Sequence, residues 1–392
     1  MNTLVAKKRI DSIDQLRGII MIIMALDHVR DFFHNDAMLH DPTNPETTTP
    51  ILFFTRWITH FCAPLFVFLA GTSAFLTGTR RTKKELSVFL LKRGLWLLVL
   101  ELVIFNLIFS FDPLYHVVAV QVIWVTGISM IILAAALWLP LPVIFALGVL
   151  LVAGHNLLDR FNVFPPNGQP SVWWAFLHQQ SFFPMGQNRA LLVFYPLIPW
   201  PGILLLGYCL GSLYTKEYDP AKRRKLLVTI GLIATAVFFI LRGINVYGDL
   251  FKWSTQKNAT ATIISFFNVT KYPPSLLYCC MTIGPGLLML VLLEKLKSGW
   301  QNIVVIYGRV PLFYYILHFF TIHFFCMIAF FATGHGLNEA TGTMMFFRPN
   351  EFGFSLGTVY LIWIAIVAGL YPLCKKYSLY KSTHSQWWLS YL

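Results

Sequence analysis

The chain has 392 residues, of which 57% are hydrophobic and only 12% are charged, whereas a soluble protein carries about 25% charged residues. This composition excludes a soluble globular protein and predicts an all-α polytopic membrane protein with the lipid bilayer as its surroundings. The net charge of +13 would fit a nucleic-acid-binding protein, but the positions of the charges along the chain exclude that reading.

About ten segments are long and apolar enough to cross the bilayer as helices. They are residues 16–33, 57–76, 89–109, 115–137, 141–157, 190–213, 226–244, 275–293, 303–331 and 354–373. The connections on the side of the N-terminus are short and leave no room for a soluble domain. We therefore treat residues 1–392 as a single integral membrane domain.

The lysines and arginines divide unequally between the two sides that these segments define. Nineteen lie on the side of the N-terminus: Lys7, Lys8, Arg9, Arg80, Arg81, Lys83, Lys84, Lys92, Arg93, Lys216, Lys222, Arg223, Arg224, Lys225, Lys295, Lys297, Lys375, Lys376 and Lys381. Seven lie on the other side: Arg56, Arg160, Arg189, Lys252, Lys257, Lys271 and Arg348. Positive charge collects on the cytoplasmic side of membranes, so both termini are predicted to be cytoplasmic and no nucleic-acid partner is expected.

The first predicted helix carries polar side chains at membrane depth, where they are costly and usually functional. Arg17, Met21, Met24 and His28 share one face, with His28 ~16 Å further from the cytoplasm than Arg17. An arginine is suited to bind phosphate or carboxylate. This stripe would therefore accommodate an elongated amphiphile such as acyl-coenzyme A, with its anionic end at Arg17.

Two carboxylates of the same helix lie within one turn of His28. Asp27 adjoins it and Asp31 follows three residues later, so either could orient the imidazole and raise its basicity. Asp31 could instead pair with Arg30, which would then only anchor the end of the helix. Ten of the eleven histidines fall on the outer side or in the outer half of a segment. Either outer loops simply hold more polar residues, or several histidines converge on one chamber.

Arg93 and His318 are the next polar candidates in the chain. Arg93 lies near the cytoplasmic end of the third segment and would either join Arg17 in a phosphate site or anchor the helix end. His318 is predicted to be a packed, hydrogen-bonded core residue. The six cysteines form no C-x-x-C pair, and P-loop, H-E-x-x-H and G-x-S-x-G motifs are absent from the sequence, so neither zinc, ATPase nor hydrolase chemistry is indicated.

Several runs of residues resemble the catalytic domain of the heparan-α-glucosaminide N-acetyltransferases. They are Arg9-x-x-Ser12-Ile-Asp14-x-x-Arg17-Gly18 followed by Met24, then Trp57-Ile-Thr-His60-Phe-Cys-Ala-Pro64-Leu-Phe66-Val-Phe68-Leu-Ala-Gly71-Thr-Ser73, and Tyr195-Pro-Leu-Ile-Pro199-Trp200-Pro-Gly202 with Gly207 and Gly211. The spacing from Arg17 to His28, and the run from Gly308 to His318, also resemble the wider superfamily of membrane acyltransferases that modify surface sugars. Residues 9–245 are most like the catalytic core, and residues 246–392 form the remaining helical bundle.

The resemblance implies an integral membrane acyltransferase, located in a bacterial inner membrane, that takes acyl groups from acyl-coenzyme A, acetyl-coenzyme A above all. The acceptor would be an extracytoplasmic glycan or amino sugar, no metal is expected, and a homo-oligomer is compatible with the sequence. His34 is the closest match to the active histidine of the heparan acetyltransferases, whereas His28 matches that of the sugar acyltransferases. We rank these two equally and His60 third, with Arg17 and Arg93 as ligands of coenzyme A.

The alternative interpretation is a transporter or a metal-handling protein. Asp27, His28, Asp31, His34 and His60 together carry groups that bind divalent metals or relay protons. The absence of a clear inverted repeat in the sequence counts against a transporter.

Overall fold

The computed structural model describes residues 10–166, 168–296 and 299–390. Its helices are α1 (Asp11–Phe33), α2 (Pro50–Thr59), α3 (Cys62–Gly78), α4 (Lys83–Val99), α5 (Asn106–Ser110), α6 (Val122–Ala136), α7 (Leu141–Gly154), α8 (Val172–Leu177), α9 (Trp200–Gly211), α10 (Pro220–Ile244), α11 (Ala259–Phe267), α12 (Leu276–Lys295), α13 (Gly299–Arg309), α14 (Pro311–Ala332) and α15 (Leu356–Thr383). A π-helical turn, Leu100–Phe105, joins α4 to α5. Lys7, Lys8, Arg9 and Lys297, which enter the charge count above, lie outside the described residues.

The protein is mostly helical, and every predicted membrane segment overlaps a helix. In the described part of the chain, six stretches are long and apolar enough to cross a membrane: Pro50–Gly78, Leu141–Phe161, Pro220–Ile244, Leu276–Lys295, Pro311–Ala332 and Leu356–Thr383. The helices α6 and α9 are apolar but shorter. An integral membrane protein is thereby confirmed, while the number of ten spans and the cytoplasmic location of the termini stay predictions.

Three short strands replace helix at two places where the sequence predicted it. The strands β1 (Val117–Val120), β2 (Ser181–Pro184) and β3 (Ala190–Val193) form a sheet in the order β1-β3-β2. β1 is parallel to β3, with Val117 opposite Ala190, and β2 is antiparallel to β3. The segments 115–137 and 190–213 therefore begin as strands, and these apolar starts pair with each other.

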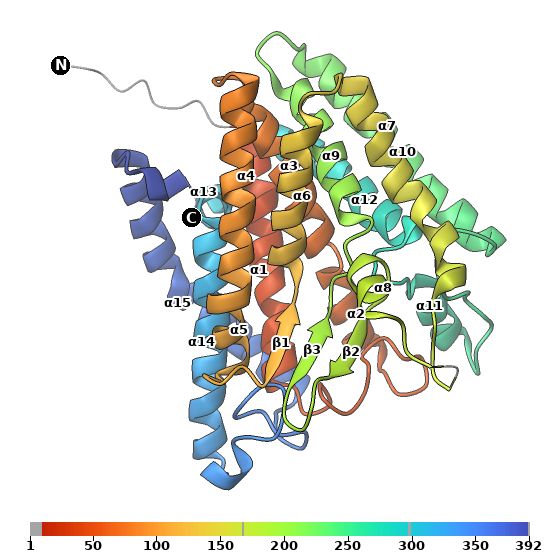
Figure 1. Ribbon diagram of the computed structural model, residues 1–392, viewed down its shortest axis with the longest axis vertical. Helices are drawn as coiled ribbons and strands as arrows, with labels where there is room; N and C mark the ends of the chain where they lie inside the picture. The colour runs from red at the N-terminus through yellow and green to blue at the C-terminus, as the bar shows by residue number, and fades with distance from the viewer. Residues whose placement is uncertain (1–9, 167, 297–298, 391–392) are drawn as a thin grey trace.

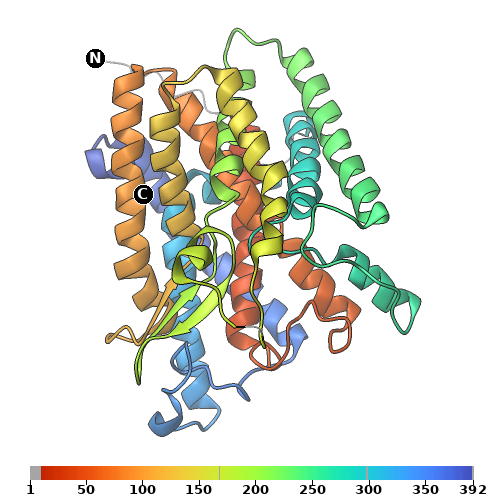
Figure 2. The ribbon, with the colours of Figure 1, turned by 45° about the vertical axis from the view of Figure 1, so that its right-hand side comes forward.

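The central element of the bundle is α1, which contacts α2, α3, α12, α13, α14 and α15. It runs through the middle of the molecule in both views (Figures 1 and 2). The three strands, α2, α8 and α11 lie around the end of the bundle where α1 ends, whereas α4 and α10 begin at the opposite end, where α1 begins (Figure 1). The basic segments 80–84 and 222–225 thus share one end of the molecule.

Glycines allow the closest helix contacts, as is common where helices pack in membranes. A Cβ at Gly207 of α9 would collide with the backbone carbonyl of Phe68 in α3, and a Cβ at Gly71 would collide with that of Leu204. The same holds for Gly18 of α1 against α13. These contacts fix α3, and with it the face that lines the site described below.

Gly207→Ala is expected to lower the free energy of unfolding by about 1–3 kcal/mol, because α3 and α9 must separate to admit the methyl group. Gly243→Ala in α10 is the matched control: a Cβ added there would meet no atom within 4 Å, so alanine's higher helix propensity should leave stability equal or greater. Midpoints of thermal unfolding in detergent measure both. Equal midpoints for the two variants would show that the α3–α9 contact is not tight.

Candidate functional site

A basic pocket of about 300 Å³ lies where α1, α3, α4, α6 and α14 converge. Its five basic residues are Arg17, Arg81, Arg93, Arg309 and Lys381. The described residues that line it include neither aspartate nor glutamate. We call this space the basic pocket; its lining attracts an anionic ligand.

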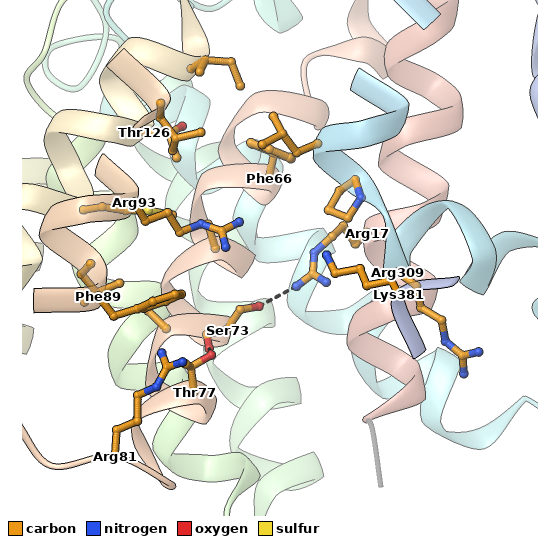
Figure 3. Close-up of a pocket in the computed structure, with 18 residues that line it drawn as sticks. Arg17, Phe66, Ser73, Thr77, Arg81, Phe89, Arg93, Thr126, Arg309 and Lys381 are labelled. Atoms are coloured by element: carbon orange, nitrogen blue, oxygen red, sulfur yellow. Dashed lines mark hydrogen bonds between the residues drawn. The ribbon is translucent and has the colours of Figure 1, made fainter. Parts of the chain in front are cut away.

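Arg17 is held at the edge of the basic pocket by three hydrogen bonds. Its guanidinium donates to the Ser73 hydroxyl (2.7 Å), to the Gly308 carbonyl (3.2 Å) and to the Asp14 carboxylate (3.0 Å). Figure 3 shows Arg17 reaching Ser73 of α3, with Arg93 extending from α4 on the other side of the space. The two arginines that sequence analysis selected thus line one pocket, although they come from different helices.

The apolar wall of the basic pocket is not the stripe of α1 that the sequence suggested. Met21 is fully buried and Met24 is 5% exposed, because the neighbouring helices cover that face of α1. The wall is formed instead by α3, where Phe66, Ala70, Ser73 and Thr77 follow each other at helical spacing. The expectation that Met21 and Met24 would line the donor site together with Arg17 was wrong.

A second cavity, of about 450 Å³, lies between the loops at the end of the bundle where α1 ends. We call it the polar pocket. Its lining combines amides, aromatic rings and two cations: Asn44, Asn162, Gln179, Gln180, Asn268, Phe164, Phe251, Tyr272, Arg56 and Lys271, with His60 and Asp41. Amides bind hydroxyl groups and aromatic rings pack on the apolar faces of rings, so this lining suits a polyhydroxylated ligand.

Asp27 links α1 to the wall of the polar pocket. Its carboxylate lies 2.6 Å from Arg56, 3.0 Å from Arg30 and 3.8 Å from Lys271. Arg30 also contacts Asp31 at 2.5 Å. Burial opposes ionisation of the nearby Tyr272 phenol, but the charges of Lys271 and Arg56 outweigh it and lower its pKa. The inner wall of the polar pocket therefore carries excess positive charge.

The carboxylates of α1 are thus engaged by cations. In the described part of the chain, no hydrogen bond that meets the usual geometry joins Asp27 or Asp31 to His28. The expected pairing of Asp31 with Arg30 is present. Asp27 acts on His28 only through its neighbouring charge.

His28 lies in the middle of the bundle and still keeps accessible surface. Its ring centroid is 4.2 Å from that of Phe319, 5.4 Å from that of His318 and 6.4 Å from that of Tyr315, all on α14. Tyr315 is stacked on Phe105 of the π-helical turn. His28 thus stands against a layer of aromatic and imidazole rings.

His34 lies beyond the end of α1 and is covered by the segment before α15. Its carbonyl accepts a hydrogen bond from Arg348 (2.6 Å), and its backbone pairs with Phe354. Burial lowers the pKa of its imidazole. It lines neither of the two pockets.

His60 ends α2 and lines the polar pocket. Its carbonyl accepts a hydrogen bond from the Tyr278 hydroxyl (2.7 Å), and the residue is 2% exposed. Within the described residues, its Nδ1 atom has no hydrogen-bond partner. His60 is thus placed to bind a ligand of the polar pocket.

The remaining histidines do not gather in one chamber. His116 contacts Asp112, His178 contacts Asp159 next to His155, and His335 contacts Glu339. Sequence analysis did not select Ser73, Arg56, Lys271 or Tyr272 for the site. Arg56 carried a signal, because it is a cation one turn before His60 in an apolar helix. Ser73 ends the run that resembles the family's second helix, whereas Tyr272 carried no signal.

Comparison with known proteins gives one informative match. The model of a protein family described as heparan-alpha-glucosaminide N-acetyltransferase, catalytic, matches residues 9–242, more than half of the chain. No curated protein matches. The matched region includes Arg17, Arg93 and the three candidate histidines, whereas Lys271 and α14 follow it.

Proposed function

Because the chain belongs to the heparan-alpha-glucosaminide N-acetyltransferase catalytic family, whose members are membrane acetyltransferases, we propose that it carries an acyl group across a bacterial inner membrane. The donor is acyl-coenzyme A, acetyl-coenzyme A above all, bound from the cytoplasm. The acceptor is the hydroxyl or amine of an extracytoplasmic glycan or amino sugar. The donor occupies the basic pocket and the acceptor occupies the polar pocket.

The proposal is supported by the neighbours of His28, which lines neither pocket itself but adjoins elements that reach both. Leu312 lines the basic pocket, and His318, beside His28, follows it by six residues, ~9 Å along α14. On the other side, Asp27 adjoins His28 in sequence and binds Arg56 of the polar pocket. A donor and an acceptor entering from opposite ends would therefore meet at His28.

The basic pocket fits the charges and shape of coenzyme A. Its phosphates need several cations, and arginine binds phosphate through two parallel hydrogen bonds. Arg17 is already oriented by Ser73, so little of its conformational freedom is lost on binding. Phe66, Leu97 and Leu312 give the pocket an apolar lining, suited to the thin arm that carries the acyl group.

His28 is the proposed base of the reaction. One ring nitrogen takes the proton from the acceptor hydroxyl or amine, whose oxygen or nitrogen forms a bond to the acyl carbon. The carbon–sulfur bond then breaks, and the departing thiolate receives the proton from the imidazolium. Arg56, Lys271 and His60 hold the acceptor. Asp27 keeps Arg56 and Lys271 in place, and Asp31 pairs with Arg30.

Transport or metal handling receives no support. In the described part of the chain, no group of three or more His, Cys, Asp or Glu side chains is arranged to hold a metal ion. Asp27 and Asp31 are occupied by arginines, which competes with metal binding.

The test of the two pockets is a pair of substitutions with opposite expected effects. Arg17→Gln should raise the KM for acetyl-coenzyme A by about 10- to 100-fold, the loss of one charged hydrogen bond, and leave the KM for the acceptor unchanged. Lys271→Gln should raise the KM for the acceptor and leave the KM for acetyl-coenzyme A unchanged. Asp27 keeps Arg56 and Arg30 as partners in this variant. Release of coenzyme A, with glucosamine and other sugars as acceptors, measures both constants. An unchanged KM for acetyl-coenzyme A in Arg17→Gln would refute the donor site.

A further inference from the structure

His318 is a buried imidazole whose hydrogen position is fixed by the backbone. It is 0% exposed, and its Nδ1 lies 2.8 Å from the carbonyl oxygen of Tyr314, one turn earlier in α14. A carbonyl oxygen only accepts hydrogen bonds. The hydrogen of the neutral ring must therefore be on Nδ1, and Nε2 carries a lone pair.

That lone pair has no protein partner. Among the described residues, Nε2 of His318 is buried without a hydrogen bond. A buried acceptor without a partner is destabilising, so an arrangement of this kind calls for an explanation. The ring also stacks on Tyr314 at 4.9 Å, which keeps its plane fixed.

A neighbour that can supply the missing donor is His28. The two ring centroids are 5.4 Å apart and the planes are inclined by 33°. At this separation, nitrogens on facing edges of the two rings can approach to about 3 Å, the usual hydrogen-bond distance. Phe319 packs against His28 and limits other rotations.

We propose that His318 is a positioning residue: its Nε2 accepts the N–H of His28 and so selects the His28 tautomer that points a lone pair at the acceptor. This rests on the proposed acyl transfer with His28 as base. Asp27 and Asp31 cannot take this part, since arginines hold both. The carboxylate that orients the base in many enzymes is here replaced by a second imidazole with a backbone-fixed hydrogen. When the reaction protonates His28, the same hydrogen bond stabilises the imidazolium.

Two substitutions at His318 distinguish the positioning role from a role in packing alone. Asparagine places its amide N–H near the position of Nδ1, so it keeps the bond to Tyr314 but has no atom at Nε2. Glutamine places its amide oxygen near Nε2 and restores an acceptor there. His318→Asn is therefore expected to lower kcat at least about tenfold with both KM values unchanged, whereas His318→Gln should keep kcat within about threefold of the wild type.

The outcomes distinguish this inference from the proposed function. If His28→Ala loses activity while His318→Asn keeps the full kcat, only the positioning role of His318 is overturned. An equal fall of kcat in His318→Asn and His318→Gln has the same consequence. Full activity in His28→Ala, or no transfer by the wild type, overturns both. In the His28→Ala background, His318→Asn should have no further effect, because the two residues act as a unit.

A measurement independent of activity completes the test. In protein labelled with ¹⁵N-histidine, the Nε2 resonance of His318 should be that of an unprotonated nitrogen and should shift in His28→Ala, which removes its donor. A protonated Nε2, or a resonance unaffected by His28→Ala, would contradict the proposal.

Discussion

His28→Ala is expected to lower kcat for acyl transfer by about 10²- to 10⁴-fold, the contribution of a general base. The protein should still fold, because the His28 side chain keeps accessible surface and is not tied into the ion pairs around Asp27. Both KM values should stay near those of the wild type, since Arg17 and Lys271 lie in the two pockets and not at the base. Steady-state release of coenzyme A by the purified variant measures all three constants.

His34→Ala is the matched control for this experiment, because sequence analysis ranked the two histidines equally. The contact of His34 with Arg348 is made by its carbonyl oxygen, which alanine keeps, so kcat should change little. His60→Ala, at the polar pocket, should act mainly on the KM for the acceptor. A severe loss of kcat in His34→Ala with normal turnover in His28→Ala would move the base to His34 and contradict the proposed mechanism.

The helices could be predicted from the sequence because hydropathy reports directly what is stable in hydrocarbon. The predicted segment 303–331 nevertheless divides into α13 and α14, which break at Val310 before Pro311. The strands β1 and β3 could not be predicted. The residues that pair are more than 70 positions apart in the sequence. A short apolar run is also compatible with either a strand or a helix.

A residue of the candidate site could be predicted from the sequence only where its position depends on a single helix or on its depth in the membrane. Arg17 and Arg93 were selected because both carry charge at the same end of a predicted segment, and they line one pocket. The partners of Asp27 were not foreseeable, because Arg56 and Lys271 reach it from distant parts of the chain. Helical periodicity relates residues of one helix and says nothing about which helix packs against it. The contact of His28 with α14 was missed for the same reason.

The most direct test of the proposed function is acyl transfer across a sealed membrane. The protein is reconstituted into vesicles that enclose a glucosamine-terminated oligosaccharide, and acetyl-coenzyme A is added outside. Because the two pockets lie toward opposite ends of α1, acetylated product should form inside the vesicles and be absent with His28→Ala. With donor and acceptor both outside, intact vesicles should form no product in either orientation of the protein, and detergent should restore the reaction. Product formed in intact vesicles with both substrates on one side would contradict the central claim.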